Sequence, residues 1–319
     1  QDPRSKCALS KCALIAIGLV PVSEATSDNN GRLDELIGRL WSTNNGESFG
    51  LELVSTSLLP QGSGMGTSSI LAACVLSSLG QCLGLTEVKD PSYLTRAVLH
   101  LEQLLSTGGG WQDQVGGLYG GLKLCTANVN QLPVEVQVKE CNLSTETVHA
   151  LNQRLLLAFT GQPRLAKNIL QKVLRQWSQR SPKIMDTVKN LVSGAHQTIQ
   201  TVERQDYAEL GKLIDAYWSQ KKIMAGGKES GVEPESVSEL LGILRNANII
   251  EGATLAGAGG GGFLAVLLKE GNDVNTVKKS IESNQKLNEL FSWYDCNVCN
   301  DGLRNFVPGS DEFEMQWHS

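Results

Sequence analysis

The chain has 319 residues, of which 41% are hydrophobic and 19% charged, and its formal net charge is −5. This composition suits a globular protein with room for two domains and excludes the strongly basic face of a nucleic-acid-binding protein. No apolar run reaches the roughly 18 residues of a membrane span. The eight scattered cysteines favour reduced thiols in a cytoplasmic protein.

The first half of the chain is expected to mix helices and strands. Apolar residues at helical spacing predict helices at 6–21, 33–41 and 67–83, and a further helix that begins at Pro91. Strand-like runs are found at 46–57, 116–127 and 132–140, and the polar run at 24–32 predicts a loop. We expect these residues to form one α+β domain that ends at residue 148.

The second half is expected to be a separate domain, covering residues 149–319. It begins with a buried strand at 155–161 and continues with amphipathic helices at 164–180, 185–204, 207–224 and 233–248. A glycine-rich segment at 255–270 leads into another strand, and 273–292 predicts a helix before an irregular end.

The first motif is the stretch PQGSGMGTSS at residues 60–69, directly before an apolar helical run. Its alternating glycines let backbone N–H groups converge, and Thr67 or Ser68 is expected to cap the helix. A helix N-terminus attracts phosphate, so the stretch predicts a cradle for a nucleotide triphosphate. It lacks the lysine of the Walker loop and the spacing of the dinucleotide fingerprint. A tight turn before a capped helix is the plainer alternative.

The second motif pairs two acids that are 11 residues apart, Glu102 on a predicted helix and Asp113 in GGGWQDQVGGLYGG (108–121). Phosphoryl transfer to a hydroxyl needs positioned phosphates, Mg²⁺ and often a carboxylate that accepts the hydroxyl proton. One acid for the metal ion and one for the proton would fit that chemistry. The alternatives are an Asp in a turn and a solvated Glu on a helix surface.

The third motif is the glycine run Gly257-Ala258-Gly259-Gly260-Gly261-Gly262, which precedes a predicted buried strand. A flexible loop is the simple interpretation. Five glycines also allow the backbone to approach a ligand or another loop closely.

Together, in this order and spacing, the three motifs resemble those of the GHMP kinases, which phosphorylate small molecules. More narrowly, PQGSGMGTSSILA, LHLEQLLSTGGGWQDQVGGLYGG, LLLAFTGQPRLAKNILQ, YWSQKKIMAGG and LAGAGGGGFL resemble the kinase region of eukaryotic L-fucose kinases. The bacterial heptose phosphate kinases are the nearest rival. The resemblance implies a two-domain α+β fold, with an N-terminal domain like ribosomal protein S5 and a ferredoxin-like C-terminal domain.

The resemblance also implies roles for particular residues. Asp113 would be catalytic, and Ser68 and Glu102 would hold Mg²⁺. Lys221 and Lys222 are further candidates for the surroundings of the transferred phosphate, the alternative being solvated lysines on a helix surface. The residues expected to bind the ATP phosphates are Pro60, Gly62, Ser63, Gly64, Met65, Gly66, Thr67 and Ser68. The candidates for the substrate site are Trp111, Gln112, Thr160, Gly161, Arg164, Gly259 and Gly260. Of these, Thr160, Gly161 and Arg164 would lie near the transferred phosphate.

The implied reaction is ATP-dependent phosphorylation of L-fucose to L-fucose 1-phosphate, on the route that salvages fucose to GDP-fucose, with ATP, Mg²⁺ and a small sugar as the only partners. The early sugar-binding motif of these kinases, G-G-W-[ST]-D-[ST]-P-P, does not occur in this chain. We therefore expect an N-terminally truncated kinase. The alternatives are a heptose phosphate or other hexose kinase, and a relative that binds a ligand without catalysis.

Overall fold

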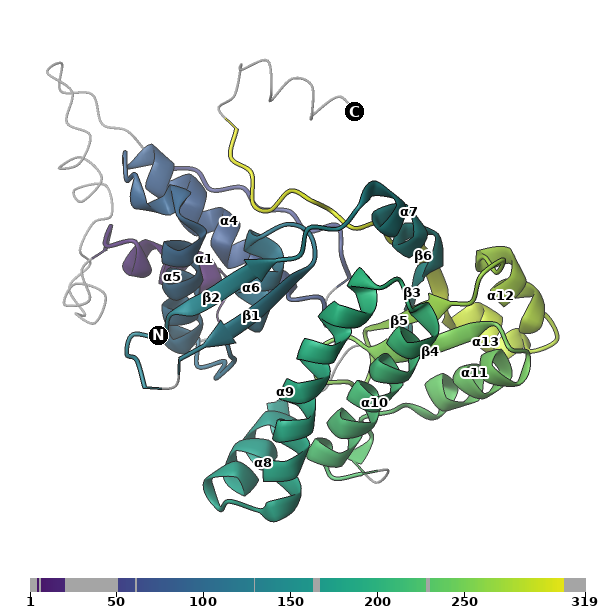
Figure 1. Ribbon diagram of the computed structural model, residues 1–319. Coiled ribbons are helices and arrows are strands. Elements are labelled where there is room, and N and C mark those ends of the chain that lie inside the picture. Colours follow the sequence, from purple (N-terminus) through teal and green to yellow (C-terminus); the bar gives the residue numbers. More distant parts are fainter. Residues whose placement is uncertain are drawn as a thin grey trace, which may run out of the picture.

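The computed structural model describes residues 5, 7–20, 51–60, 62–128, 130–162, 167–227 and 230–306. Figure 1 shows two parts: a helical part with a small sheet, and a larger sheet covered by helices, from which α8, α9 and α10 extend. The two-domain α+β class expected from the sequence is confirmed by this architecture and by the comparisons reported below.

The first part is a helix cluster with a hairpin beside it. Helices α1 (Ala8–Ala16), α4 (Thr67–Cys82), α5 (Pro91–Leu104) and α6 (Gln112–Leu118) pack around one apolar core, together with the short turn η1 (Glu87–Lys89). Strands β1 (Lys123–Ala127) and β2 (Val136–Glu140) pair antiparallel. At the start of α5 the Asp90 carboxylate accepts a hydrogen bond from the Ser92 N–H at 2.9 Å, and proline occupies the first helical position.

The second part is built on a four-stranded antiparallel sheet in the order β4-β5-β3-β6. The strands are β3 (Leu155–Phe159), β4 (Ile250–Leu255), β5 (Phe263–Leu268) and β6 (Ser292–Asp295). Helices α11 (Glu235–Asn246), α12 (Val274–Ser280) and α13 (Gln285–Leu290) bury apolar side chains against it. The core therefore lies between this sheet and the helices that cover it.

The remaining helices are α7 (Thr145–Arg154), α8 (Lys167–Ser178), α9 (Pro182–Glu203) and α10 (Tyr207–Ala225). Of these, α7 leads from the first part into the second, and the other three follow β3 within the second part. Helix α10 packs closely on β4, because Gly211 lies against Glu251 and Gly252 lies against the Gly211 carbonyl, where any Cβ would collide. This close packing fixes α10 beside the glycine-rich loop that follows β4.

After β6 the chain returns to the first part, which Figure 1 shows as the yellow segment running toward α4. The Gly121 N–H donates to the Cys299 carbonyl at 2.7 Å, the Leu303 N–H donates to the Leu118 carbonyl, and Asn305 Nδ2 donates to Ser77 Oγ at 2.6 Å. The two parts are thus joined by α7 and again by this segment. The predicted domain boundary between residues 148 and 149 falls within α7 and stays a prediction.

Several predicted elements differ from the structure. Residues 51–57 form no strand, although Leu51 and Leu53 pack on the helical core while Glu52 and Val54 are exposed, so the alternation is real but no neighbouring strand pairs with it. The strand predicted at 116–127 begins only at Lys123, because 112–118 are helical. The strand predicted at 132–140 begins at Val136.

The C-terminal half also departs from the prediction in three places. The helix predicted at 273–292 is two short helices, α12 and α13, and its last residue begins β6. Strands β4 and β6 were not predicted, since each is short and its pairing depends on β5 or β3 from elsewhere in the chain. The helix predicted at 33–41 and the loop at 24–32 lie outside the described residues.

Candidate phosphoryl-transfer site

The N-terminus of α4 is open to an anion. The structure places its N-cap at Gly66, in the left-handed region at φ 69°, rather than at Thr67 or Ser68 as predicted, and no side chain caps the helix. The Thr67 hydroxyl instead lies 3.0 Å from Ser63 Oγ, which also accepts a hydrogen bond from the Met65 N–H. The first N–H groups of this 16-residue helix therefore remain available to a phosphate.

The phosphate loop at 60–68 packs directly on the third glycine motif. The Phe263 N–H donates to the carbonyl of the buried Ser63 at 2.9 Å. A Cβ on Gly64 would lie 2.9 Å from the Ala256 carbonyl oxygen, and one on Gly262 would lie 2.4 Å from that of Ser63. Glycine is therefore required where the two loops meet, and the third motif fixes the position of the first.

Asp113 lies against the phosphate loop, although 47 positions in sequence separate it from Gly66. A Cβ on Gly66 would lie 3.0 Å from Asp113 Cβ and 3.4 Å from Asp113 Oδ1. The carboxylate is in the first turn of α6, where a negative charge is favourable, and its residue is exposed. An acid held on the surface directly beside an anion-binding loop can reach both a bound nucleotide and a second substrate.

Glu102 is the buried acid of the site, with 6% of its surface exposed. Its Oε1 accepts a 2.5 Å hydrogen bond from Ser69 Oγ, and its Oε2 accepts a 2.9 Å hydrogen bond from Gln114 Nε2. Burial raises the pKa of Glu102, the two hydrogen bonds oppose that rise, and the nearby charge of Asp113 adds to it. The carboxylate is thus held rigidly between α4, α5 and α6.

The donors around Glu102 fit a magnesium ion. Mg²⁺ prefers oxygen ligands and is usually held by one or two carboxylates together with substrate phosphates. Gln114 Oε1 is buried without a hydrogen-bond partner among the described residues, and an unsatisfied carbonyl oxygen of this kind can accept a hydrogen bond from a metal-bound water. Ser68, the other predicted ligand, is exposed on the first turn of α4. Within the described ranges, no group of three or more His, Cys, Asp or Glu forms a metal centre by itself.

The two candidate lysines on α10 have different environments. Lys222 Nζ lies 2.9 Å from Glu233 Oε2, and the Glu233 carboxylate also accepts hydrogen bonds from Trp218 Nε1 and Ser238 Oγ. Lys221 Nζ donates to the carbonyls of Leu255 and Gly257. Lys222 is therefore engaged in a polar cluster on its own side of the helix, whereas Lys221 holds the start of the third glycine motif.

The predicted substrate-site residues lie in different environments. The Thr160 N–H donates to the Gly262 carbonyl at 2.9 Å, and Thr160 Oγ1 is buried with no hydrogen-bond partner in the described part of the chain. Gly260 donates to the Val232 carbonyl, and Gly259 packs against Val232 and Trp218. Trp111 is half-buried at the N-cap of α6, and Gln112 is exposed. Arg164 lies outside the described residues, and Gly161 contacts Leu290 of α13.

Three residues of this region were not predicted. Ser69 and Gln114 bind Glu102, and only their positions beside Ser68 and Asp113 in the motifs pointed to them. Burial of part of the Tyr217 side chain on α10 raises its pKa, and the nearby negative charge of Asp113 adds to that rise. Helix α10 therefore contributes an aromatic side chain toward Asp113, which no local pattern indicates.

Two family models match the chain. Residues 34–121 match the model described as GHMP kinases N terminal domain, and residues 198–286 match the model described as GHMP kinases C terminal. The first match contains the phosphate loop, Glu102 and Asp113, and the second contains α10 and the third glycine motif. The matched regions thus include the three motifs that the structure brings together.

Curated relatives with matching sequences include sugar kinases. The chain is 34% identical over 251 residues to a bifunctional fucokinase/GDP-fucose pyrophosphorylase of Arabidopsis thaliana, covering 78% of this chain and 23% of that protein. It is 30% identical over 288 residues to an L-fucokinase/L-fucose-1-P guanylyltransferase of Bacteroides fragilis, covering 86% and 27%. The chain thus spans about a quarter of the length of these two relatives. A D-glycero-alpha-D-manno-heptose 7-phosphate kinase of Campylobacter jejuni is 24% identical, over 78% of this chain and 71% of that protein.

Solved structures share the fold at lower identity. The galactokinase of Lactococcus lactis, crystallised with galactose, superposes with a TM-score of 0.55 at 14% identity, covering 77% of this chain and 69% of that one. This likeness concerns the fold alone. Among the helices that the structure describes, none combines the length and the apolar character that crossing a bilayer demands.

Proposed function

We propose that this chain, which belongs to the GHMP kinase family, carries the kinase site of an ATP-dependent sugar kinase that phosphorylates L-fucose at its anomeric hydroxyl. The observation that carries the proposal is the convergence of three separate segments: the uncapped N-terminus of α4, Asp113 against Gly66, and the buried Glu102. A protein that only binds a ligand would need the anion site but neither of the two acids. The sequence similarity to two proteins named as fucokinases supports the choice of sugar.

Each part of the site has a role in the proposed reaction. The backbone N–H groups of the phosphate loop and of α4 bind the ATP phosphates, and Glu102 with Ser68 would hold Mg²⁺. Bound Mg²⁺ neutralises charge on the phosphates. Asp113 orients the sugar hydroxyl and accepts its proton, while the γ-phosphoryl group passes to the sugar oxygen and ADP leaves. The product is L-fucose 1-phosphate.

We further propose that the reaction takes place in the cytoplasm, with residues 1–148 and 149–319 as the two domains. All eight cysteines are described and none forms a disulfide, which suits a reducing compartment. A heptose phosphate kinase remains the second candidate because of the similarity to the Campylobacter jejuni protein. Only that candidate requires a phosphorylated acceptor.

The test uses the chain with ATP and Mg²⁺ and a panel of L-fucose, galactose and a heptose 7-phosphate. We expect L-fucose to be the best acceptor. Asp113→Asn should lower turnover by about 10³-fold or more, since a positioned proton acceptor contributes about 10²–10⁴-fold. ATP affinity should change little, because the phosphate loop is unchanged. A preference for the heptose phosphate would transfer the assignment to the second candidate.

Two further outcomes would reject the proposal. Turnover by Asp113→Asn within a few-fold of wild type would remove Asp113 from the mechanism. ATP binding without phosphorylation of any sugar by the wild-type chain would favour a relative that binds without catalysis. Asp186→Asn is a suitable control, since Asp186 is an exposed acid on α9 that is not among the residues predicted for the site.

A further inference from the structure

A cavity separate from the phosphate loop lies in the C-terminal half, between α11, α13 and the end of β3. Its volume is about 760 Å³, which is within the range of small-molecule sites. The lining residues are Gln162, Pro234, Glu235, Ser236, Gln285, Lys286, Glu289 and Leu290. None of them belongs to the phosphate loop or carries either acid of the site described above. We call this space the α11 cavity.

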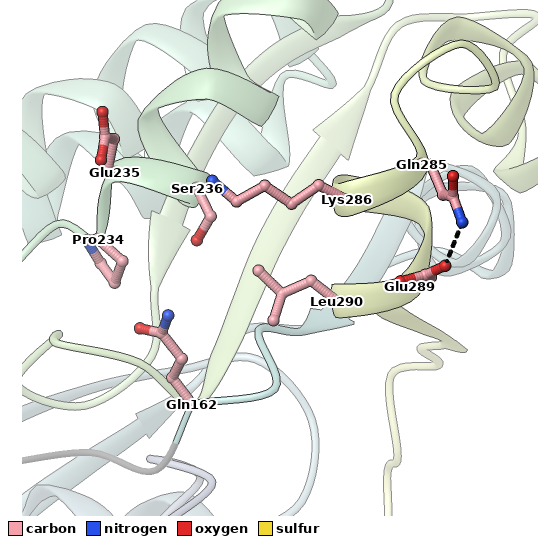
Figure 2. Close-up of a pocket in the computed structure, with 8 residues that line it drawn as sticks. All are labelled: Gln162, Pro234, Glu235, Ser236, Gln285, Lys286, Glu289 and Leu290. Atoms are coloured by element: carbon pink, nitrogen blue, oxygen red, sulfur yellow. Dashed lines mark hydrogen bonds between the residues drawn. The ribbon is translucent and has the colours of Figure 1, made fainter.

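The end of α11 at this cavity can bind an anion. The helix has 12 residues, its N-cap is Pro234, and no side chain caps its first N–H groups. Ser236, in the first turn, is 5% exposed, and its hydroxyl oxygen is buried without a hydrogen-bond partner among the residues that the structure describes. In Figure 2 this hydroxyl points into the space between Pro234 and Leu290. A buried hydroxyl is normally hydrogen-bonded, so its lack of a partner indicates that a ligand belongs there.

Among the charged side chains that line the cavity, Lys286 is the one that extends toward the Ser236 hydroxyl. Figure 2 shows the side chain of Lys286 extending from α13 toward Ser236, while the carboxylate of Glu235 points away from the cavity centre. Glu289 Oε1 is engaged by Gln285 Nε2 at 2.7 Å. Among the described residues Lys286 forms no ion pair. An anion at this position would meet an ammonium group, a hydroxyl and a helix N-terminus.

Apart from Lys286 and the carboxylates of Glu235 and Glu289, the residues that line the cavity are uncharged. Gln162 presents its amide, and Pro234 and Leu290 present apolar surface. A single phosphate ion would leave most of the volume empty. We propose that the α11 cavity binds a phosphorylated sugar or a similar small phosphomonoester, with its phosphate at Ser236 and Lys286 and its neutral body at Gln162.

The cavity adjoins the proposed kinase site at Gln162. The Gln162 carbonyl accepts a hydrogen bond from the Gly262 N–H at 3.0 Å, and Gly262 in turn packs on the phosphate loop. A binding experiment must therefore keep the ATP site filled. Otherwise a phosphate compound could bind at the N-terminus of α4 instead.

The test is calorimetric titration of the chain, saturated with Mg²⁺ and a non-hydrolysable ATP analogue, with glucose 6-phosphate, inorganic phosphate or glucose. Glucose 6-phosphate should bind more tightly than inorganic phosphate, and glucose should not bind measurably. Lys286→Gln should weaken glucose 6-phosphate binding about tenfold or more, as expected for the loss of a charge-assisted contact. Ser236→Ala should weaken it several-fold.

Both variants should fold. Lys286 is exposed, and Ser236→Ala removes a buried polar group that has no partner, which is neutral or favourable for stability. Lys278→Gln is the matched control, since Lys278 is an exposed lysine on α12 outside the cavity, and it should leave binding unchanged. Equal affinity for inorganic phosphate and glucose 6-phosphate would overturn the sugar phosphate assignment. Unchanged binding in Lys286→Gln, or none to wild type, would overturn the site.

The binding test of the α11 cavity and the test of the proposed kinase function can fail independently of each other. Lys286→Gln should phosphorylate L-fucose at the wild-type rate when no phosphomonoester is added. Asp113→Asn should bind glucose 6-phosphate in the α11 cavity as wild type does. Loss of that binding in Asp113→Asn would indicate that the compound occupies the kinase site, and would overturn the proposal of a second site.

Discussion

Replacing Gly66 with alanine tests whether the phosphate loop and Asp113 work as one unit. Gly66 has a φ of 69°, which an L-residue adopts only at a cost. The new Cβ would lie 3.0 Å from Asp113 Cβ and 3.2 Å from Asp113 Cγ, so the Asp113 side chain must move by a few tenths of an ångström. Gly66→Ala therefore has two separable effects, backbone strain and displacement of the acid.

Gly84→Ala tests the backbone strain without a displaced acid. Gly84 has a φ of 71°, but a Cβ there would meet no atom within 4 Å. Each substitution should lower the free energy of unfolding by about 1–2 kcal/mol, which is the cost of a left-handed conformation for alanine. The melting temperature should fall by about 2–4 °C per kcal/mol in both. The difference between the two variants then measures the contact with Asp113.

The assay is kcat for sugar phosphorylation at saturating ATP, with thermal unfolding measured in parallel. A catalytic group displaced by 1 Å can cost about 10²-fold in rate, so a shift of a few tenths of an ångström should cost roughly tenfold. Gly84→Ala should retain the wild-type kcat. Equal kcat in the two variants, with equal losses of stability, would refute the argument that Gly66 positions Asp113.

Two further predictions concern charged groups. Because burial raises the pKa of Glu102, the native state holds this proton more tightly than the unfolded state does. Without Mg²⁺, the free energy of unfolding should therefore fall as the pH rises from the ordinary glutamate pKa to the raised one. Glu102→Gln should flatten this part of the stability–pH curve in urea titrations and abolish the Mg²⁺-dependent activity; an unchanged curve would contradict the assignment. Lys222→Met should cost about 1–2 kcal/mol by leaving the half-buried Glu233 without its cation, whereas Lys212→Met, which breaks an exposed pair, should cost under about 0.5 kcal/mol. Equal melting temperatures for the two lysine variants would argue against a structural role for Lys222.

Local sequence patterns determined much of the helical framework and the three motifs. The helices near Pro91 and at 207–224 follow from apolar stripes and from capping residues such as Asp90 and Asp206, whose effects extend over only a few positions. The glycine runs and the two acids were recognisable because phosphate binding and phosphoryl transfer require those residue types. The similarity to known kinases rests on the same segments.

Only the tertiary structure decided which groups meet. Ser69 was indistinguishable in sequence from its neighbours, and it is the packing of α4 on α5 that turns its hydroxyl to Glu102. Lys221 and Lys222 are adjacent in sequence, yet the position of α10 on β4 directs one to the third glycine motif and the other to Glu233. Strand β6 forms because it pairs with β3, which lies more than 130 positions earlier in the chain. Contacts between distant segments depend on how whole elements pack, and no local propensity encodes that packing.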